Sequence, residues 1–252
     1  YTAKDLAMGE SSDLAILEPG ARQVSWSVRL AGELIRWDWS SGEPAVRDLE
    51  PVRRIPRGRF KSRGVPGRVA SGITGGWVGF ESGLEYSLVR QLERDRGIEW
   101  LVSQPVLLEG ERRHTPDYLE VRRGGVTRLW DARPRARRDE AFEVAAALTR
   151  RACASVGWEY EVFEGLSEVE ELNSIWLYGH RRVPLGFDRM RHGILCDAHN
   201  APTLGALLAT SRSRPEYVSA VWHLVWLGEI RFDLSQLITE NVVIHCAGDV
   251  DG

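Results

Sequence analysis

Hydrophobic spacing alternates between a helical and a strand-like period across residues 78–165, and this order constrains the fold more than any other feature of the sequence. Residues 78–95 place an apolar side chain at every fourth position, which predicts a helix, and residues 137–157 predict a second one. Strand-like segments lie between and after these helices, at 99–110, at 115–134 as two strands around Gly124-Gly125, and at 158–165. The predicted order is helix, strand, strand, strand, helix and strand, which indicates an α/β fold.

The residues before this segment predict an arm that carries a hairpin. Residues 24–39 alternate apolar and polar side chains on either side of Ala31-Gly32, as a β-hairpin does. Residues 1–20 show no clear period, and the Gly- and Pro-rich residues 51–76 predict a loop. The expected divisions of the chain are an N-terminal arm with its hairpin and basic loop at 1–76, a core at 77–166, and a C-terminal domain at 167–252.

The C-terminal residues predict a helical, winged-helix-like domain. Ser167 and Glu170 have the spacing of a capping box, which indicates that a helix starts there. A loop is expected near the sequence CDAHNAPT, followed by two helices at 203–211 and 215–227 and a strand pair at 229–234 and 241–246. The second of these helices is apolar nearly all round. We therefore expect it to pack within the domain or against a partner protein rather than to read DNA bases.

Composition is that of an ordinary globular protein, with 43% hydrophobic and 27% charged residues and a net charge of -3. No apolar run approaches the roughly 18 residues that a membrane helix needs, and no basic-then-apolar leader opens the sequence. Cys153, Cys196 and Cys246 are far apart, which fits neither a disulfide framework nor a zinc site. We therefore expect a cytoplasmic protein with reduced thiols and no membrane partner.

Basic charge is almost entirely arginine and is concentrated in one segment. Lys4 and Lys61 are the only lysines, so no chemistry beyond residue 61 can use one. Residues 51–70 hold seven basic residues and no acidic one. Such a run either follows a phosphate backbone or forms a solvated linker. The residues expected to contact DNA are Arg53, Arg54, Arg57, Arg59, Lys61, Arg135 and Arg137.

Three acidic residues are expected to meet at one end of the predicted sheet. Asp117 lies early in one strand and Asp131 late in the next, and the Gly-Gly turn pairs the two strands. Glu85, on the preceding helix, supplies a third carboxylate. Oxygen ligands with no nearby Cys or His set favour Mg²⁺, or Mn²⁺ in its place. The alternative is structural, because an Asp before a strand often caps a turn.

The motifs around these acids resemble the PD-(D/E)XK nuclease core and, more narrowly, the TnsA-like endonuclease subunit of heteromeric transposases. The family pattern has a Glu on the first core helix, a Q-P pair in the first strand, T-P-D-[FY]-L, and a closing x-V-[KR]-P. This chain offers Glu85, Gln104-Pro105, TPDYL at 115–119 and DARP at 131–134. The similarity extends from about residue 24 to the C-terminus.

The resemblance implies a restriction-endonuclease-like core and a Mg²⁺-dependent endodeoxyribonuclease activity. Such a subunit cuts the strand at transposon ends that its partner, a DDE-type transposase, leaves uncut, and an AAA+ ATPase is a further expected partner. Carried over to this sequence, Glu85, Asp117 and Asp131 bind the metal. Asp131 stands where better-known members have Gln, and is an acid as in ordinary members of the superfamily.

Arg133 departs from the pattern, because the nuclease motif has lysine at its place. Arginine holds a phosphate bidentately but cannot act as a base, and a metal-bound hydroxide removes the need for one. Lys61 is a weaker candidate for the missing lysine. Two alternatives to a transposon nuclease follow: a catalytically inactive DNA-binding and assembly subunit, and a defence or repair nuclease of the same fold. Two secondary site residues are Glu81, expected at the solvent edge with a second metal as the alternative, and Gln104, expected to be structural.

Overall fold

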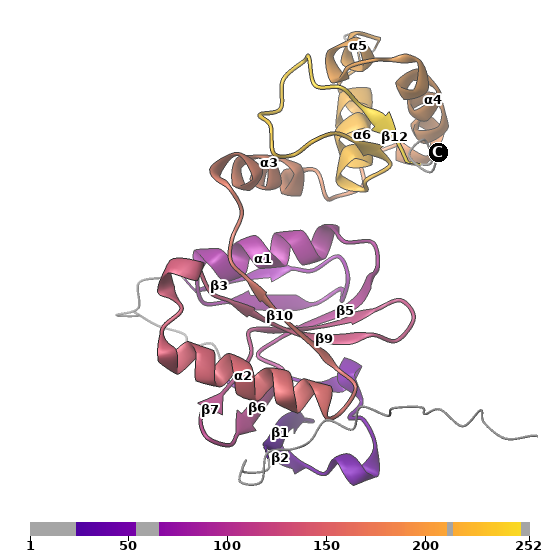
Figure 1. The fold of residues 1–252 in the computed structure, drawn as a ribbon. Coiled ribbons are helices and arrows are strands. Elements are labelled where there is room, and N and C mark those ends of the chain that lie inside the picture. The colour runs from indigo at the N-terminus through magenta and orange to yellow at the C-terminus, as the bar shows by residue number, and fades with distance from the viewer. Residues whose placement is uncertain (1–23, 54–65, 211–213, 248–252) are drawn as a thin grey trace, which may run out of the picture.

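The chain has a mixed α/β fold with several sheets and six α-helices in the residues described by the computed structural model, which are 24–53, 66–210 and 214–247 (Figure 1). The predicted α/β class is confirmed at this level. Within these described ranges, no helix is long and apolar enough to cross a membrane.

The central sheet has the strand order β10-β9-β8-β5. β8 (Tyr118–Arg122) pairs in antiparallel fashion with β5 (Ile98–Ser103) and with β9 (Thr127–Ala132), and β10 (Glu159–Phe163) runs parallel to β9. Gly124 and Gly125 connect β8 to β9 with φ angles of 89° and 84°, a left-handed conformation that glycine adopts at little cost. The predicted strand pair and its turn are therefore confirmed.

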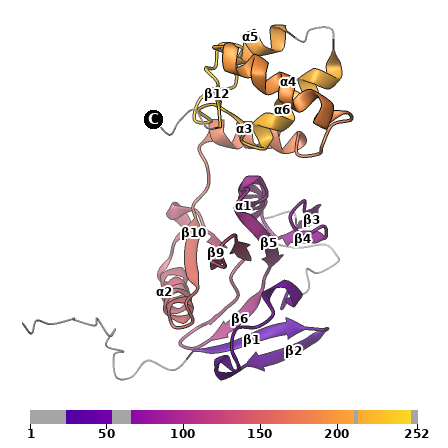
Figure 2. The ribbon, with the colours of Figure 1, turned by 90° about the vertical axis from the view of Figure 1, so that its right-hand side faces the viewer.

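Two helices cover opposite faces of this sheet (Figures 1 and 2). α1 (Gly83–Arg94) buries Leu88 and Leu92 in a cluster that includes Tyr118 of β8. α2 (Glu140–Ala154) packs Leu148 and Ala152 into a different cluster, which takes apolar side chains from the other face of β8 and β9. The alternating side chains of the two central strands thus supply both cores.

The start of the first predicted helix was wrong. α1 begins at Gly83, because the Ser82 side chain caps it by accepting a hydrogen bond from the backbone N–H of Glu85. The preceding residues form β4 (Trp77–Phe80), which pairs with β3 (Gly67–Ala70). Both strands lie in regions predicted as helix and loop, because four-residue strands that contain glycine carry little periodic signal.

The strand predicted at 99–110 is also interrupted. Gln104, with φ of 48°, and Pro105 separate β5 from β6 (Val106–Glu109), which belongs to another sheet. A left-handed residue followed by proline breaks the strand ladder and redirects the chain.

The second sheet has the order β2-β1-β6-β7, with β7 at Arg113–His114. The predicted hairpin is confirmed as β1 (Ser25–Leu30) and β2 (Glu33–Trp37), which turn at Ala31-Gly32. β1 pairs with β6 and β3 with β4, so sheet pairing crosses the predicted division between residues 76 and 77. Short 3-10 helices complete the region at η1 (Trp39–Ser41), η2 (Val46–Asp48) and η3 (Arg135–Arg137).

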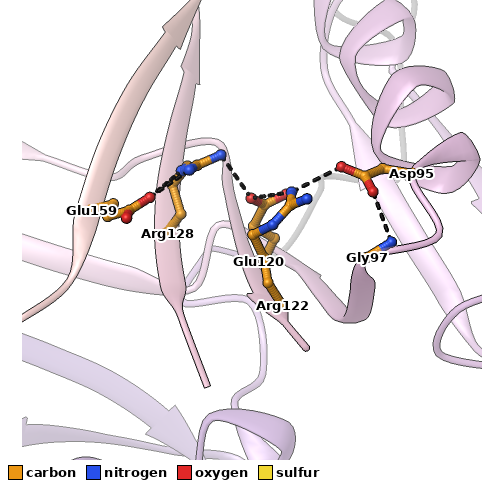
Figure 3. A network of polar contacts seen from close by, with 6 residues as sticks. All are labelled: Asp95, Gly97, Glu120, Arg122, Arg128 and Glu159. Carbon is orange, nitrogen blue, oxygen red and sulfur yellow. Dashed lines mark hydrogen bonds and ion pairs between the residues drawn. The ribbon is translucent and has the colours of Figure 1, made fainter. Parts of the chain in front are cut away.

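A network of charged side chains around the buried Glu120 crosses the central sheet (Figure 3). Glu120 of β8 is 0% exposed and accepts from Arg122 at 3.3 Å and from Arg128 of β9 at 3.2 Å. Arg122 pairs with Asp95 beyond α1, and Arg128 pairs with Glu159 of β10. The network links strands β8, β9 and β10 with the end of α1.

The C-terminal region is mainly helical. α3 (Glu168–Gly179) begins with the predicted capping box of Ser167 and Glu170. α6 (Pro215–Trp226) is buried along most of its length, which confirms that it packs inside the domain. α5 (Leu204–Ala209) and a strand pair at β11 (Ile230–Arg231) and β12 (His245–Cys246) match the remaining predictions in order.

An additional helix, α4 (Phe187–Asn200), begins before the predicted loop at CDAHNAPT and occupies most of it. Its buried side chains Ile194 and Ala198 are four residues apart, but charged residues around them hide this period in the sequence. The C-terminal helices meet the core through α1 and α3, where the buried Arg90 pairs with Glu171.

Candidate active site

The candidate active site lies where α1 and strands β8 and β9 come together. Asp117 directly precedes β8, and its backbone N–H donates to the carbonyl of Trp130 at 2.8 Å. The Asp117 carboxylate reaches across to β9, where Oδ2 accepts from the backbone N–H of Ala132 at 2.7 Å. Asp131, next to Ala132, is 3% exposed. The strand register thus brings together the two acids that the sequence placed on paired strands.

Glu85 joins them from the first turn of α1. Its Oε2 accepts from the backbone N–H of Glu81 at 2.7 Å and its Oε1 accepts from the Ser82 hydroxyl at 2.9 Å. Burial raises the pKa of Glu85, and the charges of Glu81 and Asp131 add to this, although its two hydrogen bonds act in the opposite direction. The carboxylate is therefore near enough to Asp131 for the two charges to repel.

Asp117 bears the strongest effect of this crowding. Burial raises its pKa well above the usual value, and the nearby charges of Asp131, Glu85 and Glu81 raise it further. Only the hydrogen bond from Ala132 acts in the opposite direction. A cation placed among these carboxylates would relieve the repulsion and favour the ionised form of Asp117.

Asp131 has two side-chain partners that the sequence did not indicate. His114 Nε2 lies 2.8 Å from Oδ2 and 3.1 Å from Oδ1, and the Tyr160 hydroxyl donates to Oδ2 at 2.6 Å. Burial raises the pKa of Tyr160, with Asp131 adding to the effect, so its hydroxyl keeps the proton that it donates. In the sequence, His114 belongs to no set with ligand spacing, and Tyr160 is one aromatic residue in a predicted strand. Tyr160 becomes a candidate partner of Asp131 only once β10 is known to pair in parallel with β9.

The two secondary residues contact each other beside the acids. Gln104 donates from its backbone N–H to the carbonyl of Asp117 at 2.7 Å and from Nε2 to Glu81 Oε1 at 2.9 Å. Its Oε1 is buried and accepts no hydrogen bond from the described residues. Glu81 precedes α1 rather than lying on it, and its side chain is partly buried. The helix begins later because Ser82 caps it.

Arg133 points toward η3 and α2. Its Nε donates to the carbonyl of Arg137 at 2.8 Å, its guanidinium lies 3.6 Å from Asp139, and it stands 5.4 Å from the centre of the Phe142 ring. Arg135 and Arg137 are exposed on η3, and Arg53 is exposed near the end of the first described range. The other residues expected at DNA lie outside the described residues; these are Arg54, Arg57, Arg59 and Lys61.

The donor set suits a hard divalent cation in its chemistry, since carboxylates and one unpaired amide oxygen are the ligands that such ions prefer. In the arrangement seen here, each carboxylate is engaged by N–H or O–H donors. No group of three or more His, Cys, Asp and Glu side chains in the described part of the chain is arranged to hold a metal ion. Binding one would require the acids to exchange some of these donors for the cation.

No protein-family model matches the chain, and the search of curated proteins finds no match. The acid cluster and the sequence motifs around it are therefore the basis for a functional assignment.

Proposed function

We propose that this chain is a metal-dependent endodeoxyribonuclease with a restriction-endonuclease-like core and a winged-helix-like C-terminal domain, similar to the TnsA-like subunit of heteromeric transposases. It would cut one strand at transposon ends together with a DDE-type transposase. One observation carries the proposal: Glu85 on α1, Asp117 just before β8 and Asp131 on β9 approach one another, and burial together with the charges of the other two acids raises the pKa of Asp117. A fold tolerates such repulsion where function requires it.

Glu85, Asp117 and Asp131 would hold the cation, Mg²⁺ or Mn²⁺. When bound, such an ion lowers the pKa of a coordinated water and offsets negative charge on the phosphate. Arg133 would then hold the phosphate that is cut. Its side chain is 38% exposed and its ion pair with Asp139 is long, at 3.6 Å. Rotation of this side chain toward a bound DNA strand would therefore cost little free energy.

DNA and protein partners are also part of the proposal. Arg135 and Arg137 are exposed just beyond Arg133 and can contact phosphates on either side of a cut. Apolar side chains of α3 are about half exposed, which supports docking of the transposase or an AAA+ ATPase to this helix; they are Leu172 at 53%, Ile175 at 52% and Trp176 at 51%.

A catalytically inactive assembly subunit is the second candidate, and the position of Arg133 favours it. Its guanidinium is held by Arg137, Asp139 and Phe142 rather than by any of the three acids. In this alternative the chain binds DNA and recruits the transposase, which carries out all cutting.

Nicking of supercoiled plasmid in Mg²⁺ and in Mn²⁺, with and without the transposase, tests the proposal. Asp117→Asn keeps an acceptor for the Ala132 N–H but removes the charge, and we expect it to abolish nicking. Glu161→Gln, at an exposed acid of β10, is the matched control and should cut as the wild type does. If the wild type binds DNA but never cuts, even with the transposase, the assembly subunit is the correct assignment.

A further inference from the structure

The two oxygens of the Asp131 carboxylate have unequal surroundings. Oδ2 is 2.6 Å from the Tyr160 hydroxyl and 2.8 Å from His114 Nε2, whereas among the described residues Oδ1 has only the longer contact of 3.1 Å with the same nitrogen. Two good donors nearly saturate Oδ2, and Oδ1 keeps its better lone pair. Any ion that Asp131 binds should therefore be bound through Oδ1.

The two donors hold Asp131 from different sheets. His114 belongs to β7, in the sheet of the N-terminal hairpin, and Tyr160 belongs to β10, at the edge of the central sheet. Arg150 of α2 lies 5.6 Å from the centre of the Tyr160 ring, on which it packs. Neither donor contacts Asp117 or Glu85 by a hydrogen bond that the structure describes. Their common feature is the Asp131 carboxylate.

We propose that His114 and Tyr160 are positioning residues, which fix the Asp131 carboxylate so that Oδ1 is the oxygen offered to the metal. The inference rests on the proposed function, because it assigns a role within that site. A carboxylate held by two donors loses little further freedom when it binds an ion, and hydrogen bonds from outside the ligand set keep ligands oriented in metal sites generally. Neither residue belongs to the motifs that suggested the site.

Mn²⁺ titration of the full chain by calorimetry tests this role apart from cutting. Tyr160→Phe removes one hydroxyl, and His114→Ala removes the imidazole. We expect each variant to bind Mn²⁺ about 10-fold more weakly than the wild type. His114→Gln returns an N–H close to the position of Nε2, and it should recover most of the affinity lost in His114→Ala.

Tyr217→Phe is the matched control, because the Tyr217 hydroxyl also donates to a carboxylate, that of Asp197 in the C-terminal region. This variant should bind Mn²⁺ as tightly as the wild type, and thermal unfolding of every variant shows whether it is folded. A folded Tyr160→Phe variant with wild-type affinity would overturn the positioning role while leaving the nuclease proposal intact. If the wild type binds no Mn²⁺, alone or with DNA, both proposals fail together.

Discussion

Asp117, directly before β8, and Glu120, within it, lie three residues apart and have opposite surroundings, the first partly buried and the second fully buried. Glu120 lies between Arg122 and Arg128, in a network that alternates in sign from Asp95 to Glu159 (Figure 3). Asp117 lies among other acids, and the described residues place no arginine or lysine in an ion pair with it. Burial is the largest cause of a raised pKa at both. The neighbouring charges oppose that rise at Glu120 and add to it at Asp117.

Under the proposed function, the difference separates a structural carboxylate from one that would bind a cation. A buried carboxylate with arginine partners ties strands together, and its loss leaves those arginines without a partner. A cluster of like charges opposes folding, and under the proposed function a bound cation would neutralise it. Two carboxylates only three residues apart should therefore respond to substitution with opposite effects on stability.

Glu120→Ala should have the largest effect on stability. It leaves Arg122 and Arg128 unpaired and opens space under the sheet, which should cost about 3 kcal/mol of the free energy of unfolding in urea. Glu159→Ala removes the exposed end of the same network and is the control, with an expected loss below about 1 kcal/mol. Equal losses in the two variants would show that the buried Glu120 contributes no more to stability than the exposed Glu159.

The acid cluster was predictable because its determinants are local. Period-two alternation and the Gly-Gly turn fix how β8 pairs with β9, and this register then places Asp117 beside Asp131. Glu85 follows from the helix that packs on the same strands. The start of that helix was misplaced, since one Ser82 cap outweighed the apolar spacing that continues back to Phe80.

The partners of these acids were not predictable, because they depend on contacts between distant segments. His114 reaches Asp131 only because β7 pairs with β6 after the turn at Gln104. Tyr160 reaches Asp131 only because β10, which follows α2 along the chain, pairs in parallel with β9. The arginines around Glu120 appear in the sequence as ordinary alternating charges, and nothing local distinguishes them from a solvated face.

Arg133→Ala tests the one cation that the sequence places next to the acids. If Arg133 moves to the phosphate during cutting, its removal should slow nicking about 100-fold, or about 2.7 kcal/mol, as loss of a single charge-stabilising donor does. Arg133→Lys should retain most of the rate. Arg151→Ala, at an exposed arginine paired with Glu111, controls for general loss of basic charge. An unchanged nicking rate in Arg133→Ala would show that Arg133 stays in the position seen here, toward α2, during cutting.

Asp117→Asn should stabilise the metal-free protein, in contrast to Glu120→Ala. Removal of one charge from the acid cluster relieves repulsion, and we expect a gain of about 1 kcal/mol in urea with EDTA present. Added Mn²⁺ should then stabilise the wild type and leave the variant unchanged. A loss of stability in the variant without metal would show that the Asp117 carboxylate supports the fold, as we expect of the Glu120 side chain.

The smallest effect concerns pH and compares Glu120→Gln with the wild type. Burial raises the pKa of Glu120 above 4.5 despite its two arginines, so the folded state holds this proton more tightly than the unfolded state does. The stability that this proton contributes is complete below the unfolded pKa and is lost as pH rises through the folded pKa. Relative to the glutamine variant, the wild type should therefore be most stable near pH 4 and lose that margin toward neutral pH. Urea unfolding of both proteins across this range measures the difference, and a margin that grows with pH would mean that the arginines outweigh burial.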